Sequence, residues 1–128
     1  MGIPNAGLAE MANLWGGVST PLKMAYVMTG TSDTAFAAAD TTLGTEIDDS
    51  GLQRVAVTAT RVTTNVANDT VQFVKTFTVT GTYTIKEVGI INASSTGDLG
   101  GRTVLETPKD VVNGSSYTLT HKTIFARA

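Results

Sequence analysis

The sequence predicts a mainly β protein, an antiparallel β-sandwich or partly closed barrel of about six or more strands with a short N-terminal helix. Apolar and polar residues alternate with a period of two through most of residues 22–126, which is the repeat of a half-buried strand. Glycine, asparagine and aspartate separate the alternating runs, and these residues favour turns. Threonine is abundant, as in strands with one buried and one solvated face.

Composition excludes several classes of function. A length of 128 residues suits a single core, and the net charge of -2 comes from scattered charges without the basic stripe of a nucleic-acid-binding protein. The chain has no cysteine, and so no disulfide or thiolate metal site. No apolar run approaches the ~20 residues of a membrane span, and the N-terminus lacks the features of a secretory signal. We expect no membrane, nucleic-acid or cofactor partner, and synthesis in the cytoplasm without export.

The helix is expected within the first fifteen residues and should span two turns at most. Leu8, Met11, Ala12 and Trp15 recur at helical spacing, and the glycines that follow can end a helix. Such a short helix is marginal alone, so its apolar stripe must lie against another surface. Docking on its own domain and reaching a neighbouring subunit are both open, and Leu8, Met11 and Trp15 become candidate assembly residues. The predicted division is 1–20 as helix or arm and 21–128 as β-sandwich.

The first strand is expected at 22–29, after Pro21 resets the chain. Residues 34–50 are small and polar, with a helical turn possible near 35–39. A connection of this length is usually an ordered excursion, so we expect Phe36 and Leu43 to pin it to the domain.

One long strand is then expected over residues 53–64, bent or bulged near Arg61, where the apolar set changes face.

Residues 71–80 and 82–91 form two alternating runs joined at Gly81, which predicts a hairpin-like antiparallel unit. In the second run the apolar positions change face near Lys86 and Glu87. Either an irregularity at this point restores one inward face, or residues 88–91 are covered on both sides.

The chain is expected to close with two more strands. The first, at 102–107, should end at Pro108, because proline cannot donate to a sheet ladder. Asn113-Gly114 is a strong turn signal, and residues 117–126 form the last strand.

Few residues suggest chemistry. His121, the only histidine, shares a strand face with Leu119 and Phe125 and has no nucleophile motif nearby, which favours a structural role and leaves no catalytic candidate. Glu46, Asp48 and Asp49 could hold a cation but lack the spacing of a calcium loop, which favours a solvated turn.

Lys86 and Glu87 are the one polar pair singled out within a strand. They could form an intersubunit salt bridge, or they could mark an exposed edge where charge discourages unwanted strand pairing. We add them to the candidate assembly interface.

The order of elements resembles small structural proteins of tailed bacteriophages and related viruses, over about residues 22–125. In that group a strand leads into a glycine turn and a small-residue loop, followed by an arginine-led strand, an aromatic strand, a second arginine-containing strand and a closing strand. The corresponding segments here are MAYVMTGTSDTA, TLGTE (residues 42–46), RVAV (54–57), TGTYTIKEVGIIN, GGRTVLET and YTLTHKTIF.

The resemblance implies a non-enzymatic virion component. Members of the group occur as tail-fibre or collar elements, and small stand-alone chains can decorate capsids. This chain lacks a repetitive fibre shaft, so we expect a capsid decoration or cement subunit. Its expected partners are further copies of itself and other virion proteins such as the major capsid protein. A tail, collar or fibre-associated protein, or a carbohydrate- or receptor-binding sandwich, is the alternative.

Overall fold

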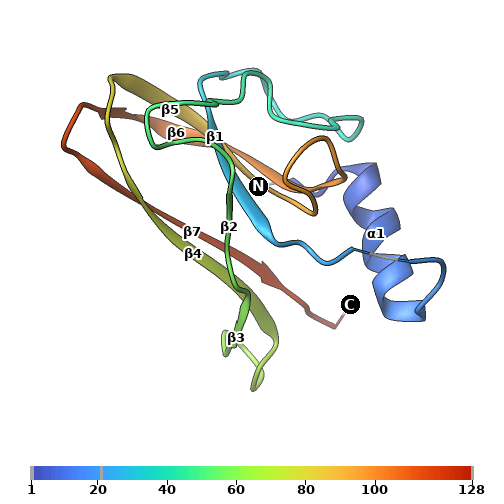
Figure 1. The fold of residues 1–128 in the computed structure, drawn as a ribbon. Helices are drawn as coiled ribbons and strands as arrows, with labels where there is room; N and C mark the ends of the chain where they lie inside the picture. The colour runs from blue at the N-terminus through green and yellow to red at the C-terminus, as the bar shows by residue number, and fades with distance from the viewer. Residues whose placement is uncertain (1, 21, 128) are drawn as a thin grey trace.

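The fold is mainly β, as predicted, with one helix and seven strands among the residues that the structure describes (Figure 1). The structure is a computed structural model that covers residues 2–20 and 22–127. Met1, Pro21 and Ala128 lie outside the described residues, and with Pro21 the expected reset of the chain before the first strand. The elements are α1 (Asn5–Gly16), β1 (Tyr26–Gly30), β2 (Val55–Ala56), β3 (Thr60–Val62), β4 (Thr70–Thr78), β5 (Tyr83–Ile91), β6 (Leu99–Val111) and β7 (Ser116–Ile124).

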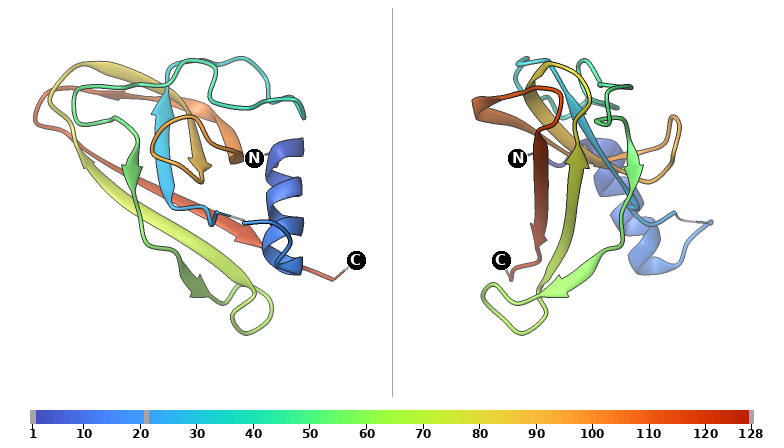
Figure 2. Two further views of the ribbon diagram at one scale, coloured as in Figure 1. Left: turned by 45° about the vertical axis from the view of Figure 1, so that its right-hand side comes forward. Right: turned by 60° about the vertical axis from the view of Figure 1, so that its left-hand side comes forward.

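Two antiparallel sheets form the layers of a sandwich and do not close into a barrel within the described residues (Figure 2). The four-stranded sheet has the order β2-β1-β5-β6, and the three-stranded sheet has the order β3-β4-β7. No helix in 2–20 or 22–127 is long and apolar enough to cross a membrane.

The main core lies between the two sheets. Phe73, Phe77 and Leu119 from the three-stranded sheet join Val27, Ile85 and Ile90 from the four-stranded sheet, and each is at most 3 % exposed. The inward positions of β4 are therefore those that the alternation predicts.

The four-stranded sheet is buried on both faces. Met28, Ile91 and Leu99 form a second cluster with Leu43, which belongs to the long excursion after β1. The prediction that Leu43 pins this excursion is confirmed, and Phe36 is half-buried over Gly2. In place of a helical turn at 35–39, a single hydrogen-bonded turn forms over 37–40. This covering explains why residues 88–91 are all buried and why their alternation is weak.

The expected irregularity in β5 is confirmed. The register with β6 shifts between Ile85, which pairs with Lys109, and Glu87, which pairs with Val104. Both interpretations of the face change therefore apply, because β5 is irregular at Lys86 and covered on both sides beyond it.

The hairpin expected at Gly81 is wrong. β4 pairs with β3 and β7, whereas β5 pairs with β1 and β6, so the chain arches from one sheet to the other at this point. The amide of Val79 donates to the carbonyl of Ser115 and that of Thr80 to Ser50, at 2.9 Å each. These long-range bonds replace the ladder that a hairpin would form.

The prediction of a single strand at 53–64 is also wrong, because this segment forms two strands that belong to different sheets. β2 pairs with β1, and β3 pairs with β4, three residues further on. The chain crosses between the layers at 57–59, just before the bend expected near Arg61.

Among the other strands, β1 and β6 differ most from their expected bounds. The first strand begins at Tyr26, and Leu22 is 54 % exposed. β6 continues through Pro108 to Val111. Proline is tolerated there because residues 105–108 fall in the register shift opposite Lys86, on an edge strand where no ladder donor is needed.

His121 lies in the core, as predicted, with its ring 6.2 Å from that of Phe73 and its Nε2 3.3 Å from the Thr123 hydroxyl. Burial lowers the pKa of His121 to about 4, because the charged imidazolium is poorly solvated inside the sandwich.

We expect this histidine to make stability depend on pH. The unfolded chain protonates His121 below a pKa of about 6.5, and the folded chain only near 4. The contribution of His121 to the free energy of unfolding should be fully present above pH 6.5 and decrease as the pH drops. The loss should reach about 3 kcal/mol once the imidazole is protonated in both the folded and the unfolded chain. Urea unfolding at pH 7 and 4.5, compared with His121→Leu, isolates the effect from the carboxylates. An equal loss in both proteins would contradict it.

Candidate functional site

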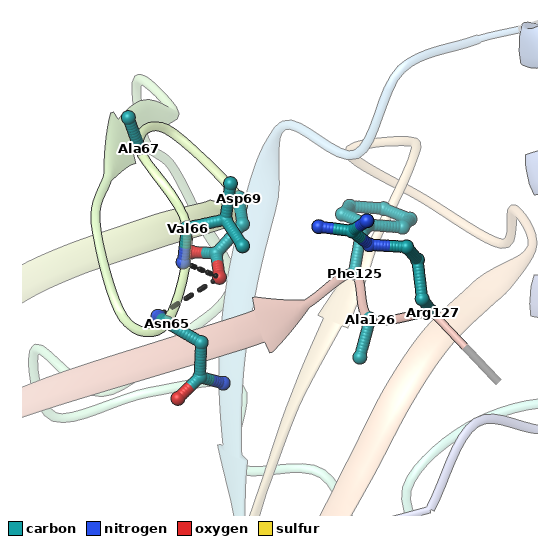
Figure 3. Close-up of a pocket in the computed structure, with 7 residues that line it drawn as sticks. All are labelled: Asn65, Val66, Ala67, Asp69, Phe125, Ala126 and Arg127. Atoms are coloured by element: carbon teal, nitrogen blue, oxygen red, sulfur yellow. Dashed lines mark hydrogen bonds between the residues drawn. The ribbon is translucent and has the colours of Figure 1, made fainter.

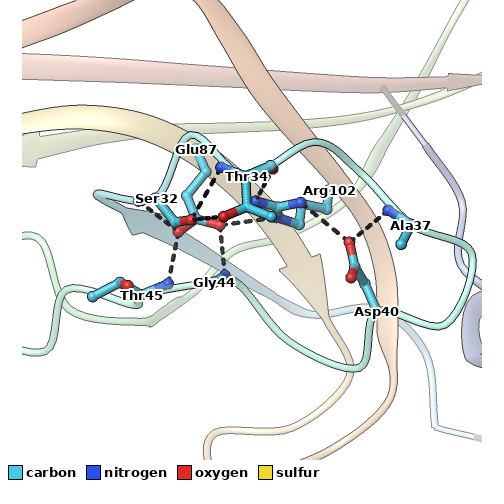
Figure 4. Close-up of polar contacts among 8 residues, drawn as sticks. All are labelled: Ser32, Thr34, Ala37, Asp40, Gly44, Thr45, Glu87 and Arg102. Carbon is cyan, nitrogen blue, oxygen red and sulfur yellow. Dashed lines mark hydrogen bonds and ion pairs between the residues drawn. The ribbon is translucent and has the colours of Figure 1, made fainter.

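Glu87 is fully buried in the centre of the four-stranded sheet. Its carboxylate accepts backbone N–H bonds from Ser32 at 3.0 Å, Gly44 at 2.7 Å and Thr45 at 2.8 Å (Figure 4). The Arg102 Nε donates a fourth bond, at 2.9 Å. Four donors around one buried carboxylate compensate for the solvation that it loses.

Arg102 continues the network outward from Glu87. It is 2 % exposed, and its guanidinium also contacts the Asp40 carboxylate at 3.1 Å and the carbonyl of Thr34 at 2.8 Å (Figure 4). Asp40 in turn accepts the amide of Ala37 at 3.0 Å. One arginine on β6 and one glutamate on β5 thus hold the excursion that follows β1 at four points of its backbone and at the side chain of Asp40.

The exposed-edge interpretation of Lys86 and Glu87 is wrong. β5 lies between β1 and β6, and all four hydrogen bonds of Glu87 are internal. Lys86 is partly exposed and pairs within the chain with Asp33, at 3.2 Å. The hydrogen bond from Lys86 lowers the pKa of Asp33. The sequence does not indicate Arg102 as the partner of Glu87, although a charge among the apolar residues of β5 is a signal that a partner is needed.

A second arginine ties two further loops together. Arg54 binds both oxygens of Glu46, at 2.7 and 3.1 Å, and donates to the carbonyls of Ala93 and Thr96. Asp49 accepts the Tyr83 hydroxyl at 2.6 Å, and this bond raises the pKa of Tyr83. Glu46 and Asp49 therefore have protein partners, and no group of three or more acidic or histidine residues suited to a metal occurs in 2–20 and 22–127.

The helix packs on β6 through a face that the apolar stripe does not predict. A Cβ at Gly7 would lie 2.8 Å from the carbonyl oxygen of Leu99, so the helix backbone approaches the strand closely. Glu10 accepts the Asn13 amide at 2.9 Å and contacts Asn92 at 3.4 Å. The helix has twelve residues, which makes it longer than the two turns expected.

The predicted stripe faces solvent. Trp15 is 94 % exposed and Leu8 is 54 % exposed, with Ala12 exposed between them and Met11 half-buried at the border. Of the two alternatives left open, docking of the stripe on its own domain is wrong for Leu8, Ala12 and Trp15, because the contact at Gly7 turns them outward. We define Leu8, Ala12 and Trp15 as the α1 patch.

An open hollow of about 480 Å³ lies between the turn at 65–69 and residues 125–127, which follow β7 (Figure 3). Four of the seven residues that line it are apolar, namely Val66, Ala67, Phe125 and Ala126. Asp69 lines it too, but its carboxylate accepts the amides of Thr64, Asn65 and Val66, which hold its pKa far below the usual range. This carboxylate is engaged by its own turn, and the hollow brings no nucleophile and base together.

We expect Glu87→Gln to destabilise the fold by about 3 kcal/mol or more, because Arg102 keeps its buried charge while the amide supplies one oxygen in place of two. The matched control is Lys86→Met, which removes the partly exposed neighbouring ion pair and should cost about 1 kcal/mol or less. Urea unfolding at pH 7 measures both. A Glu87→Gln variant as stable as the control would contradict the central role of this carboxylate.

Comparison with known proteins places the chain in a phage family. A protein family described as "Podophage GP4 fiber I protein gp80" matches residues 10–126, nearly the whole chain. No curated protein and no solved structure matches significantly. The match begins inside α1 and ends beyond β7, so it includes both arginine networks and both sheets. The chain belongs to this family of podophage fibre proteins and is a structural protein of a tailed-phage virion.

Proposed function

We propose that the chain is a non-enzymatic subunit of a phage fibre and assembles with other virion proteins through the α1 patch. The fibre description of the family favours this role over capsid decoration, our first expectation. The observation that carries the proposal is the exposure of Trp15, at 94 %.

An exposed tryptophan has a large free energy available for association. Covering about 200 Å² of its surface is worth about 5 kcal/mol before the costs of association. Trp15 and Leu8 lie two helical turns apart, and the small Ala12 between them leaves room for a partner surface. In an isolated subunit the indole of Trp15 stays in contact with water, which is unfavourable for so large an apolar surface.

The rest of the molecule suits a rigid building block. The carboxylate of Glu87 and the guanidinia of Arg54 and Arg102 bind loops of the same chain, so they stiffen the domain. The close contact of Gly7 with β6 attaches α1, and with it the α1 patch, to this stiff domain.

Trp15→Ser should leave the free energy of unfolding within about 0.5 kcal/mol of the parent, because an exposed side chain contributes little to the fold. In phage carrying the variant, we expect the protein to be depleted from purified virions, as measured by quantitative mass spectrometry. Phe125→Ser is the matched control, since Phe125 is 56 % exposed and lies outside the α1 patch. Normal incorporation of Trp15→Ser would overturn the assigned contact.

The single tryptophan also reports on assembly directly. Emission from the free subunit should resemble that of tryptophan in water and be quenched efficiently by acrylamide. In assembled fibres we expect a blue shift and weaker quenching, because the partner covers the indole. Unchanged emission in assembled fibres would exclude Trp15 from the contact.

Copy number and position distinguish the two virion roles. A fibre subunit should be far less abundant than the major capsid protein and should localise to the tail region by electron microscopy. A copy number comparable to that of the shell protein would support capsid decoration.

A further inference from the structure

We infer that the free edge of β7 pairs antiparallel with β7 of a second copy, which joins two three-stranded sheets into one sheet of six. This inference names a partner for the assembly role proposed above and rests on that role. It concerns a different surface from the α1 patch.

The two sheets have four edge strands among the described residues, and three of them are poorly suited to pairing. β2 has two residues and β3 has three. β6 carries Pro108, neighbouring charged residues and a register shift, and Gly2 already pairs with it at Arg102. Short length, proline, charge and irregularity are the usual ways of blocking an edge.

β7 has neither a proline nor an irregularity, it is long, and it carries a single charged residue on its exposed face. It pairs with β4 over nine consecutive residues without a register shift, and Lys122 is its only charged residue apart from the buried, neutral His121. Figure 2 shows β7 along one side of its sheet, with β4 as its neighbour.

The direction of the free backbone groups follows from two bonds that flank β7. Ser115 accepts the amide of Val79, and Phe125 donates to the carbonyl of Asp69, each at 2.9 Å. Both contacts bind the strand to the β4 side at odd-numbered residues. Because neighbouring residues in a strand point their N–H and C=O groups to opposite sides, the even-numbered residues present theirs to the free edge. These residues are Ser116, Thr118, Thr120, Lys122 and Ile124, and all five are exposed.

The edge is complementary to itself. If a twofold axis passes through Thr120, every free-edge residue faces another free-edge residue, and about ten backbone hydrogen bonds can form. In this register Lys122 lies opposite Thr118 of the second copy, and the two lysines are about 14 Å apart along the strands, beyond the Debye length at physiological salt. No like charges meet, which is why we assign a second copy to this edge.

The inner face of the enlarged sheet also continues without conflict. The same register sets Leu119 opposite His121 of the second copy, and both positions already face the core. The pairing therefore extends an existing layer and requires no rearrangement of the subunit.

The first test uses amide exchange in the full chain, followed by NMR. In the associated form the amides of Thr118, Thr120, Lys122 and Ile124 should be protected, and their protection should fall on dilution, whereas odd-numbered amides stay protected by β4. A protein that sediments as a monomer at NMR concentrations would overturn the inference. So would a dimer whose even-numbered amides stay unprotected.

Two variants at one exposed site test the register. Thr118→Glu should tighten the dimer at low salt, because the new carboxylate faces Lys122 of the second copy. Thr118→Lys should raise the dissociation constant roughly ten-fold, since it creates two symmetric repulsive pairs. Sedimentation equilibrium at two salt concentrations measures both. Equal dissociation constants for the two variants would exclude this register.

A proline variant tests the edge itself. Thr120→Pro removes an N–H that points away from β4, so the variant should fold and remain monomeric, whereas Thr120→Val should still dimerise. Should Thr120→Pro not fold, the charged pair at residue 118 decides alone.

Failure of this inference and failure of the proposed function can be told apart. Dimerisation of Trp15→Ser through protected β7 amides, together with absence of the parent protein from fibres, would support the pairing and refute the fibre role. Incorporation into fibres with exchanging β7 amides would refute the pairing alone. Protection that appears only when another fibre protein is added would show that the edge binds a different chain, and would also overturn the inference.

Discussion

The pairing of Glu87 with Arg102 is the interaction on which the four-stranded sheet and its covering loop depend. A buried carboxylate and a buried guanidinium are costly unless every polar atom finds a partner, and here the partners are backbone groups of the long excursion after β1. The network thus makes one conformation of that excursion strongly preferred. In this conformation Leu43 lies on the outer face of the sheet, where it packs with Met28 and Leu99 in the second cluster.

The segments that carry the resemblance to phage structural proteins are the segments that build these polar contacts. The TLGTE loop supplies Gly44 and Thr45 to the Glu87 carboxylate and Glu46 to Arg54, and GGRTVLET supplies Arg102. As linear patterns these short segments have low specificity, but in the fold they lie together around Arg54 and Arg102 and form one set of polar contacts. The family match over residues 10–126 is consistent with this, since it takes in every one of these positions.

The fold class and much of the core can be predicted from the sequence, but the pairing of strands cannot. Alternation is a local property, so it identified Phe73 and Phe77 as inward residues, yet it could not tell a hairpin at Gly81 from an arch between sheets. Helical spacing likewise found Leu8 and Trp15 on one face but not the direction of that face. The contact of Gly7 with Leu99 decides it, and a glycine contributes nothing to an apolar stripe. The burial of Glu87 depends on partners more than forty residues away.

The order of strands has a consequence for how the protein folds as it is synthesised. β4 occupies the middle of its sheet, but its long partner, β7, is the last strand of the described residues, and Thr70 of β4 pairs with Ile124 of β7. β1 likewise cannot pair with β5 until residues 83–91 are synthesised, since Tyr26 pairs with Ile91. Such distant pairings make folding slow, and β4 stays without that partner until residues 116–124 have left the ribosome. Because β7 supplies both the closing strand of its sheet and an open edge, that edge forms only once β7 has paired with β4, so the proposed pairing of two copies would follow the folding of the three-stranded sheet.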